Sequence, residues 1–239
     1  MRIHSRTDVG RVRQNNEDAI AFDAELGIAV LADGMGGLNA GEVAAGTAVQ
    51  IAMDRLRERL GDGESDLDAA LENTFREANR VVYDKSNDAS ELHGMGTTLV
   101  AAVAGADRCI TAHVGDSRAY LFKRGQLTRV TTDHSLVHEL VMQGVMSVDE
   151  ARASPNRNII TRAIGIEPEV RCDINRVPVE PGALVLMCSD GLTDMLTDAE
   201  IQDHCAERGT DPEHLIAALV ADANARGGFD NISVIAIAW

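Results

Sequence analysis

The chain has 239 residues and a mass of 25.6 kDa, which at the usual ~150 residues per domain favours one large domain or one domain with an insertion. Hydrophobic residues make up 45% and charged residues 25% of the sequence, a globular composition that excludes a disordered chain. The formal net charge of −16 argues against unaided binding to nucleic acid or to an anionic membrane, and it leaves room for a site that binds cations.

The first part of the chain is predicted to form strands and then two helices. Two short apolar runs lie within residues 20–32, and the second ends in a glycine-rich turn. Apolar residues then recur at three- and four-residue steps from Ala45 to Leu60, which predicts a long helix. Ser65 and Asp68 form a weak variant of the capping box and are expected to open a second helix.

Strands dominate the rest of the chain. The predicted strands cover residues 97–104, 109–114, 118–122, 127–130, 170–177, 184–188 and 232–238. Residues 123–126 are typical of a hairpin turn. Helices in sequential pairs, together with strands in antiparallel-looking runs, favour an α+β fold over alternating βαβ units.

Two short helices are predicted within residues 134–160, where they interrupt the strands. Ser147 and Glu150 form a capping box on the second of them, and a proline at position 155 ends it. This segment has the character of an inserted flap. Further capped helices are expected to begin at Thr197 and Thr210.

The cysteines and the N-terminal residues indicate the cellular compartment of the protein. No two of the four cysteines lie close enough for a Cys-x-x-Cys site, and Cys109 and Cys188 lie inside apolar runs, so we expect buried free thiols in a reducing compartment. The N-terminus lacks the apolar core of a signal peptide, and no apolar stretch approaches the ~18–20 residues of a membrane span. We therefore expect a cytoplasmic protein without membrane insertion.

One pattern recurs along the chain: an apolar strand runs into or out of a turn that carries an aspartate. These aspartates are Asp33, Asp116, Asp190 and Asp230. A carboxylate at the end of a buried strand is costly to ionise unless a positive charge meets it. One such residue alone is more often a simple strand terminator, but four that converge on one rim would need cations. Because only oxygen ligands are on offer, the pattern favours Mg²⁺ or Mn²⁺ over zinc.

A second candidate lies near the N-terminus, where residues 13–18 place Arg13 beside Glu17 and Asp18, just before an apolar run. Arginine is suited to binding a phosphate with two parallel hydrogen bonds. A solvated polar loop is the alternative if this motif stands alone.

Taken together, these segments resemble the metal-dependent protein phosphatases, the type 2C serine/threonine phosphatases (PPM), in their compact bacterial form. Each matching segment is short, but they follow the family order from one end of the chain to the other, which makes the resemblance highly specific. They are residues 13–18, 33–37, 96–98, 115–118, 133–135, 160–165, 189–192 and 230–233.

The resemblance implies a four-layer α/β/β/α sandwich, with two antiparallel β-sheets flanked by helix pairs. It implies a single catalytic domain over residues 1–239, with a flap over about 134–160 that shapes substrate access. The family's activity is the hydrolysis of phosphoserine and phosphothreonine in proteins, with Mn²⁺ or Mg²⁺ as the cofactor. Water activated by two metal ions attacks the phosphorus directly, and no phosphoenzyme forms.

The resemblance also implies roles for particular residues. Asp33 bridges both metal ions, and Gly34 offers its backbone carbonyl to one of them. Asp190 and Asp230 bind the other ion. Asp116, with Asp190, resembles the pair that holds a third ion in bacterial members.

The remaining implied roles concern the substrate and the water. Glu17 belongs to the metal centre, where together with Asp18 it orders metal-bound waters, and Arg13 holds the substrate phosphate. The histidine that some members carry just after the Asp-Gly pair, or a few residues later, is replaced by Met35 and Leu38, so the proton donor to the leaving group is unassigned.

Three histidines are candidates for the proton donor. His134 and His138 lie four residues apart in the flap, but a satisfied or solvated flap histidine is the favoured interpretation of both. His113, inside a strand, is expected to be structural.

The expected partners are phosphorylated proteins, including a eukaryotic-like serine/threonine kinase that the enzyme opposes or the targets of that kinase. We expect a monomer that binds no nucleic acid. The pathway stays open among growth control, stress signalling and the regulation of secretion systems.

Two other functions compete with this one. A nucleotide-binding turn at residues 34–37 fails on spacing, because Asn39 stands where the third glycine belongs. A degenerate phosphatase domain that acts as a binding or sensor module would have lost metal ligands, and every carried-over position retains its expected residue.

Overall fold

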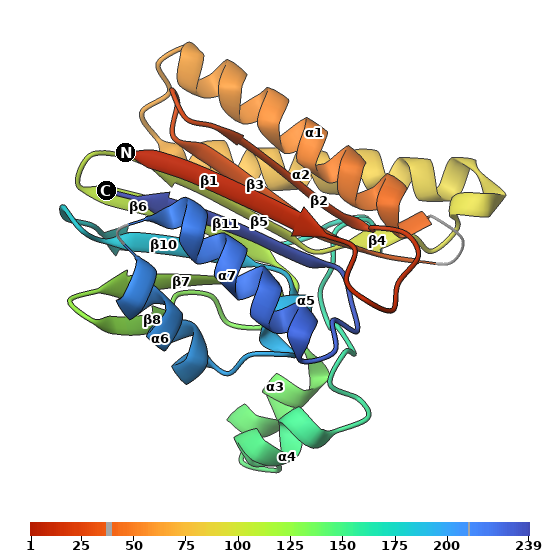
Figure 1. Cartoon of the computed structure of the whole chain (residues 1–239). Coiled ribbons are helices and arrows are strands. Elements are labelled where there is room, and N and C mark those ends of the chain that lie inside the picture. The colour runs from red at the N-terminus through yellow and green to blue at the C-terminus, as the bar shows by residue number, and fades with distance from the viewer. Residues whose placement is uncertain (37–39, 210) are drawn as a thin grey trace.

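The computed structural model describes residues 1–36, 40–209 and 211–239. Two antiparallel sheets pack face to face at its centre, and a pair of long helices covers the outer face of each (Figure 1). This is the expected four-layer sandwich, and the predicted fold class is confirmed. Gly37, Leu38, Asn39 and Thr210, which entered the sequence predictions, lie outside the described residues.

Each sheet is built from strands that are distant in the sequence. The first sheet contains, in spatial order, β1 (Arg2–Asp8), β11 (Ile232–Ala238), β10 (Leu184–Cys188), β7 (Arg118–Lys123) and β8 (Gln126–Arg129). The second contains β2 (Asp18–Asp23), β3 (Ile28–Met35), β5 (Leu99–Ala104), β6 (Arg108–Val114) and β9 (Asp173–Pro178), and the short β4 (Gly96–Thr97) pairs with β3.

The helices form the outer layers. The second sheet is covered by α1 (Ala40–Gly61) and α2 (Leu67–Asp88), and the first by α6 (Asp198–Arg208) and α7 (Pro212–Ala225) (Figure 1). The short elements are α3 (Leu136–Met142), α4 (Val148–Ala153), α5 (Asp190–Thr193) and the 3₁₀ turn η1 (Ser90–Leu92). In Figure 1, α3 and α4 project away from the sandwich. No described helix is long and apolar enough to cross a membrane.

The central strands are apolar on both faces because both faces of each sheet are covered. All seven residues of β11 are buried, as are all five of β10. Such strands appear in a sequence as continuous apolar runs rather than as an alternation. Leu31, Val100 and Ile235 belong to the apolar layer between the two sheets.

Most predicted elements are present. The two short helices of residues 134–160 are α3 and α4, and the capping box of Ser147 and Glu150 is formed. The predicted hairpin turn joins β7 to β8 through Arg124 and Gly125, at φ 54° and 80°, as expected for a turn with left-handed central residues. The four cysteines are free, as predicted.

Several local predictions were wrong, and one strand was missed. Asp211, next to the predicted Thr210, caps α7. Asp66, not Ser65, caps α2, because its carboxylate accepts from the Ala69 amide at 3.1 Å. Residues 170–172 precede β9 rather than belong to it, and the strand predicted over 97–104 is split at Thr98. Finally, β1 was not predicted, because this edge strand is mostly polar and partly exposed and therefore lacks an apolar run.

The packing between the sheets leads to a stability prediction. Ile235 is fully buried there, so Ile235→Ala should leave a cavity and lower the free energy of unfolding by about 2–5 kcal/mol. Val145→Ala, at a side chain that is 68% exposed, should change it by less than about 0.5 kcal/mol. Urea unfolding followed by circular dichroism measures both. Equal effects of the two substitutions would contradict the described core.

Candidate metal-binding active site

The four strand-end aspartates come together at the end of the sandwich opposite the chain termini (Figure 1). Asp33 lies on β3, Asp116 in the turn after β6, Asp190 at the start of α5 and Asp230 just before β11. The negative charges of the other three all raise the pKa of Asp33. Strands from both sheets therefore deliver carboxyl groups to one place.

Asp33 differs from the expectation in that it lies within a strand, not in a turn, because β3 continues to Met35. Two threonines hold its backbone. The Asp33 amide donates to Thr98 Oγ1 at 2.9 Å and its carbonyl accepts from the Thr98 amide at 2.9 Å. The Thr97 hydroxyl also donates to that carbonyl, at 2.8 Å. These bonds fix the strand while leaving the carboxylate of Asp33 uncommitted to the backbone.

Gly34, the predicted carbonyl ligand, follows in a position that only glycine can fill. A Cβ at Gly34 would collide with the backbone of Gly41, at the start of α1, and with the Glu17 carbonyl. The loop before β2, β3 and the first turn of α1 therefore meet at backbone contact. Glu17 itself lies against this turn, since a Cβ at Gly41 would approach Glu17 Oε2 to 2.5 Å. Burial raises the pKa of the Glu17 carboxyl.

Asp18 faces Asp33 across the pairing of β2 and β3. One carboxylate oxygen, Oδ2, accepts from the Ser189 hydroxyl at 2.8 Å. The other, Oδ1, is buried and has no hydrogen-bond partner among the described residues. Burial is the main cause that raises the pKa of Asp18 to about 7. An orphaned anionic oxygen of this kind is costly unless a donor or a cation meets it.

The donor chemistry of this cluster fits divalent cations. Burial, followed by repulsion from the neighbouring carboxylates, raises the pKa values of Asp33 and Asp190 well above their ordinary range. Burial also raises the pKa of Asp116 to about 6. Carboxylate and carbonyl oxygens are the ligands that hard cations such as Mg²⁺ and Mn²⁺ prefer. The residues present therefore suit the ions that the sequence analysis anticipated.

Arg13 stands at the rim of the cluster. Its Nη2 donates to Asp230 Oδ2 at 2.8 Å, and its side chain is 51% exposed. This bond is the main cause that raises the pKa of the Arg13 guanidinium, so the group is a permanent cation. Because a guanidinium has five N–H donors, one carboxylate contact leaves it able to bind an anion.

Asn231 contacts the loop that carries Arg13 and Glu17, and the sequence analysis assigned it no role. Its Nδ2 donates to the carbonyls of Val9 and Asn15, at 3.0 and 2.9 Å, and its Oδ1 accepts from the Glu17 amide at 2.8 Å. Three hydrogen bonds from one side chain thus hold the loop that carries Arg13 and Glu17. The signals in the sequence were its place in the family-like segment 230–233 and its position directly before a mostly apolar strand.

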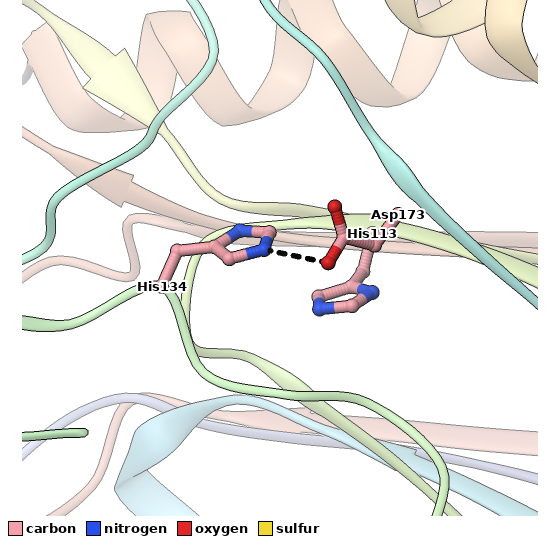
Figure 2. A group of neighbouring side chains, drawn as sticks. All are labelled: His113, His134 and Asp173. Carbon is pink, nitrogen blue, oxygen red and sulfur yellow. Dashed lines mark ion pairs between the residues drawn. The ribbon is translucent and has the colours of Figure 1, made fainter. Parts of the chain in front are cut away.

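The histidines considered as proton donors have other surroundings. His134 is buried and stacks on His113, beside Asp173 (Figure 2). Burial, mainly, lowers the pKa of His134 to about 4. His138 lines a cleft of about 660 Å³ that also touches Asp116 and Asp190, and burial lowers its pKa. Both rings are therefore neutral near pH 7.

The cleft has walls of different character. Apolar residues of α3 and α4, including Val141 and Met142, line one side. The other side is formed by residues of α5, α6 and the turn between them, including Asp194. Arg157, from the segment after α4, reaches across to Asp194 at 3.4 Å. Residues 134–160 therefore form one wall of a cleft whose floor carries two of the clustered aspartates.

Comparisons with known proteins agree with this site. The family model described as protein phosphatase 2C matches residues 8–222. The serine/threonine phosphatase stp of Listeria monocytogenes is 38% identical over 99% of this chain and 95% of its own. The Streptococcus agalactiae serine/threonine phosphatase superposes with a TM-score of 0.91 at 35% identity, over 100% and 99% of the two chains. The catalytic domain of the phosphatase PstP, solved with two manganese ions, has a TM-score of 0.86 at 34% identity, over 98% and 96%.

The chain belongs to the protein phosphatase 2C family. The resemblance drawn from the sequence is confirmed, and with it the class of activity. The protein is a metal-dependent serine/threonine protein phosphatase, a hydrolase whose substrates are phosphoproteins.

The role of Asn231 can be tested directly. Asn231→Ala should leave several backbone groups without partners, at about 1–3 kcal/mol for each that stays buried. It should also loosen the loop of Arg13 and Glu17, so both the melting temperature and kcat/KM should fall. Asn87→Ala, which removes one exposed bond to the Tyr83 carbonyl, is the control. Thermal unfolding and hydrolysis of a phosphothreonine peptide measure the two effects. Wild-type values for Asn231→Ala would exclude a role of Asn231 in holding this loop.

Proposed function

We propose that Asp33, Asp190 and Asp230, with the carbonyl of Gly34, hold two divalent cations at the catalytic centre. Asp33 contacts both ions, Gly34 one of them, and Asp190 and Asp230 the other. Asp116 and Asp190 together hold a third. The observation that carries this assignment is the convergence of these carboxyl groups: burial, and then the charges of neighbouring carboxylates, raise the pKa values of Asp33 and Asp190. The buried, unpartnered Oδ1 of Asp18 beside them adds support.

When bound, two divalent cations acidify a water and neutralise the charge of the phosphoryl group. Side chains of the protein bind the phosphate and orient the water. Arg13 binds the phosphate oxygens with the N–H groups that Asp230 does not use. Glu17 and Asp18 accept hydrogen bonds from water and orient it for in-line attack on phosphorus. The reaction is a direct hydrolysis, and no side chain of this chain forms a covalent intermediate.

The ion is Mn²⁺ or Mg²⁺, since all the proposed ligands are oxygen atoms. The two manganese ions of the PstP structure support the first choice. The substrates are phosphoserine and phosphothreonine proteins, in agreement with the names of the relatives. The enzyme opposes a serine/threonine kinase in the cytoplasm, where its four free cysteines stay reduced.

Residues 134–160 act as a flap within a single catalytic domain that comprises the chain. The support for this assignment is the cleft between α3, α4 and the sandwich, whose floor includes Asp116 and Asp190. A substrate that reaches those residues must pass along the apolar wall of the flap. The flap therefore selects among phosphoproteins by the residues that flank the phosphorylated one.

The mechanism predicts hydrolysis of a phosphothreonine peptide that requires Mn²⁺ and stops with a chelator. Asp33→Asn and Asp190→Asn should abolish it, because each removes an anionic ligand. Arg13→Ala should lower kcat/KM by about 10²–10³, the usual effect of removing one group that stabilises developing charge. Asp54→Asn, an equal charge change on an exposed position of α1, should retain wild-type activity.

A second readout separates a phosphatase from a binding module. Mn²⁺ at about 100 times its Kd should stabilise protein that a chelator has freed of metal by about 2.7 kcal/mol. Asp33→Asn should remove most of the resulting rise in melting temperature. Full activity after chelation would refute the metal mechanism. A wild-type protein that is stabilised by Mn²⁺ but hydrolyses no phosphopeptide would instead be a binding or sensor module.

A further inference from the structure

The pair of stacked histidines lies next to the catalytic centre, and nothing in the mechanism uses it. The rings of His113 and His134 are parallel within 8°, with centroids 4.8 Å apart. His134 Nε2 lies 3.3 Å from Asp173 Oδ2, the contact drawn in Figure 2. The His113 ring bonds the Thr132 carbonyl through Nε2 at 2.8 Å. This cluster fixes the plane and the position of the His134 ring.

The cluster could be taken for a cation site, because ligand atoms of His113, His134 and Asp173 lie within 4.8 Å of one another. Two contacts oppose that interpretation. The Arg162 guanidinium already lies there, with Nη1 3.0 Å from His134 Nε2 and 2.7 Å from Asp173 Oδ1. A cation would have to displace this group and overcome its charge.

The second contact fixes the tautomer of His134. The backbone amide of Gly115 donates to His134 Nδ1 at 3.0 Å, so Nδ1 carries a lone pair. The neutral ring must then hold its proton on Nε2, where Asp173 Oδ2 at 3.3 Å is the acceptor and the contact with Arg162 Nη1 is not a hydrogen bond. A metal ion on Nε2 would require that proton to leave or to move to Nδ1, which would break the bond to Gly115. His134 is built as an acceptor for Gly115.

His134 and Gly115 are joined in both directions. Besides the bond to the ring, the His134 amide donates to the Gly115 carbonyl at 3.0 Å. Gly115 is a constrained residue, with φ at +103° and space for no side chain, since a Cβ would approach Thr98 Cγ2 to 2.6 Å. The next residue is Asp116, 9% exposed. Two bonds from His134 therefore set the orientation of the peptide that leads into Asp116.

We propose that His134 is a positioning residue that holds the Gly115–Asp116 turn, so that the Asp116 carboxylate faces Asp190 and completes the third cation site. The inference rests on the ligand set given under the proposed function. It adds that the site is shaped by the first residue of the flap, because the His134 carbonyl also accepts from the Thr161 amide at 2.9 Å. Both ends of the flap are thus tied to the turn that carries Asp116.

A restraint is needed here because Asp116 and Asp190 repel each other. Burial is the main cause that raises the pKa of Asp190, and the charge of Asp116 comes next. A free turn would relieve this repulsion by rotating Asp116 away, and an arriving cation would then have to restore the turn at a cost in affinity. A ring with a fixed tautomer, held by a stack and by Asp173, avoids that cost.

The test is Mn²⁺ binding to the chelated full chain, measured by isothermal titration calorimetry and by electron paramagnetic resonance of free Mn²⁺. Asp116→Asn first identifies the binding event that depends on Asp116. His134→Ala should weaken that same event about 10- to 100-fold, the usual cost of losing a partner that orients a ligand. The other events should stay within about threefold of the wild type. In the double variant the two losses should not add, because both act through one turn.

Two further variants separate positioning from general stability. His134→Asn keeps an acceptor oxygen where Nδ1 stood and should retain the Asp116-dependent event within about threefold, whereas His134→Gln places its polar atoms one bond further out and should not. This comparison remains available should His134→Ala fail to fold, which thermal unfolding will show. Asp173→Asn keeps a side-chain oxygen that can accept from His134 Nε2 and leaves the bond to Gly115, so it should change Mn²⁺ binding by less than about threefold.

The outcomes distinguish the positioning role of His134 from the existence of the third cation site. If Asp116→Asn weakens a binding event and His134→Ala does not, the positioning role is excluded while the proposed ligand set stands. If Asp116→Asn alters no event, the third site itself is wrong and this inference fails with it. Zn²⁺ binding that requires His134 but not Asp116 would make the histidine cluster a metal site and would equally overturn the inference.

Discussion

The repulsion among carboxylates at one end of the sandwich is the constraint on which the rest of the structure depends. Burial raises the pKa values of Asp33, Asp116 and Asp190, and the charges of neighbouring carboxylates raise those of Asp33 and Asp190 further, so the fold must hold these groups together against their repulsion. A flexible scaffold would let them separate. The strands β10 and β11 behind them are wholly buried and covered on both faces, and interiors packed in this way deform little. The hydrophobic layers of the sandwich thus supply the rigidity that the site needs.

The groups that hold the site in place are almost all neutral. Thr97 and Thr98 fix the backbone of Asp33, Ser189 donates to Asp18, and Asn231 holds the loop before β2. A lysine or arginine at these positions would neutralise the carboxylates and compete with divalent cations. Neutral donors hold these groups in place by hydrogen bonds and preserve the negative potential of the cluster. This explains why an acidic site can be both well ordered and able to attract cations.

The sequence predicted the parts of the site that depend on residue type and failed on those that depend on geometry. An aspartate at the end of an apolar strand is visible in a single chain, and so are capping boxes such as Thr197 with Glu200. The role of Asn231 was not visible, because its three partners lie more than 200 residues away in the chain. The same holds for His134, which the sequence analysis weighed as a proton donor. Its acceptor role appears only when β6 brings Gly115 against it.

Arg13 links the two proposed functions of the site, cation binding and phosphate binding. Its guanidinium pairs with Asp230 at 2.8 Å, at a rim where the two side chains are 51% and 28% exposed. An ion pair this exposed contributes about 0.2–1 kcal/mol, far less than a divalent cation gains from an anionic ligand. The pair is therefore weak enough to yield Asp230 to a cation, as the proposed ligand set requires. In the proposed mechanism, once a cation binds the Asp230 carboxylate, the Arg13 guanidinium retains its charge and has its donors open to a phosphate. Cation binding and phosphate binding would then be coupled through this single contact.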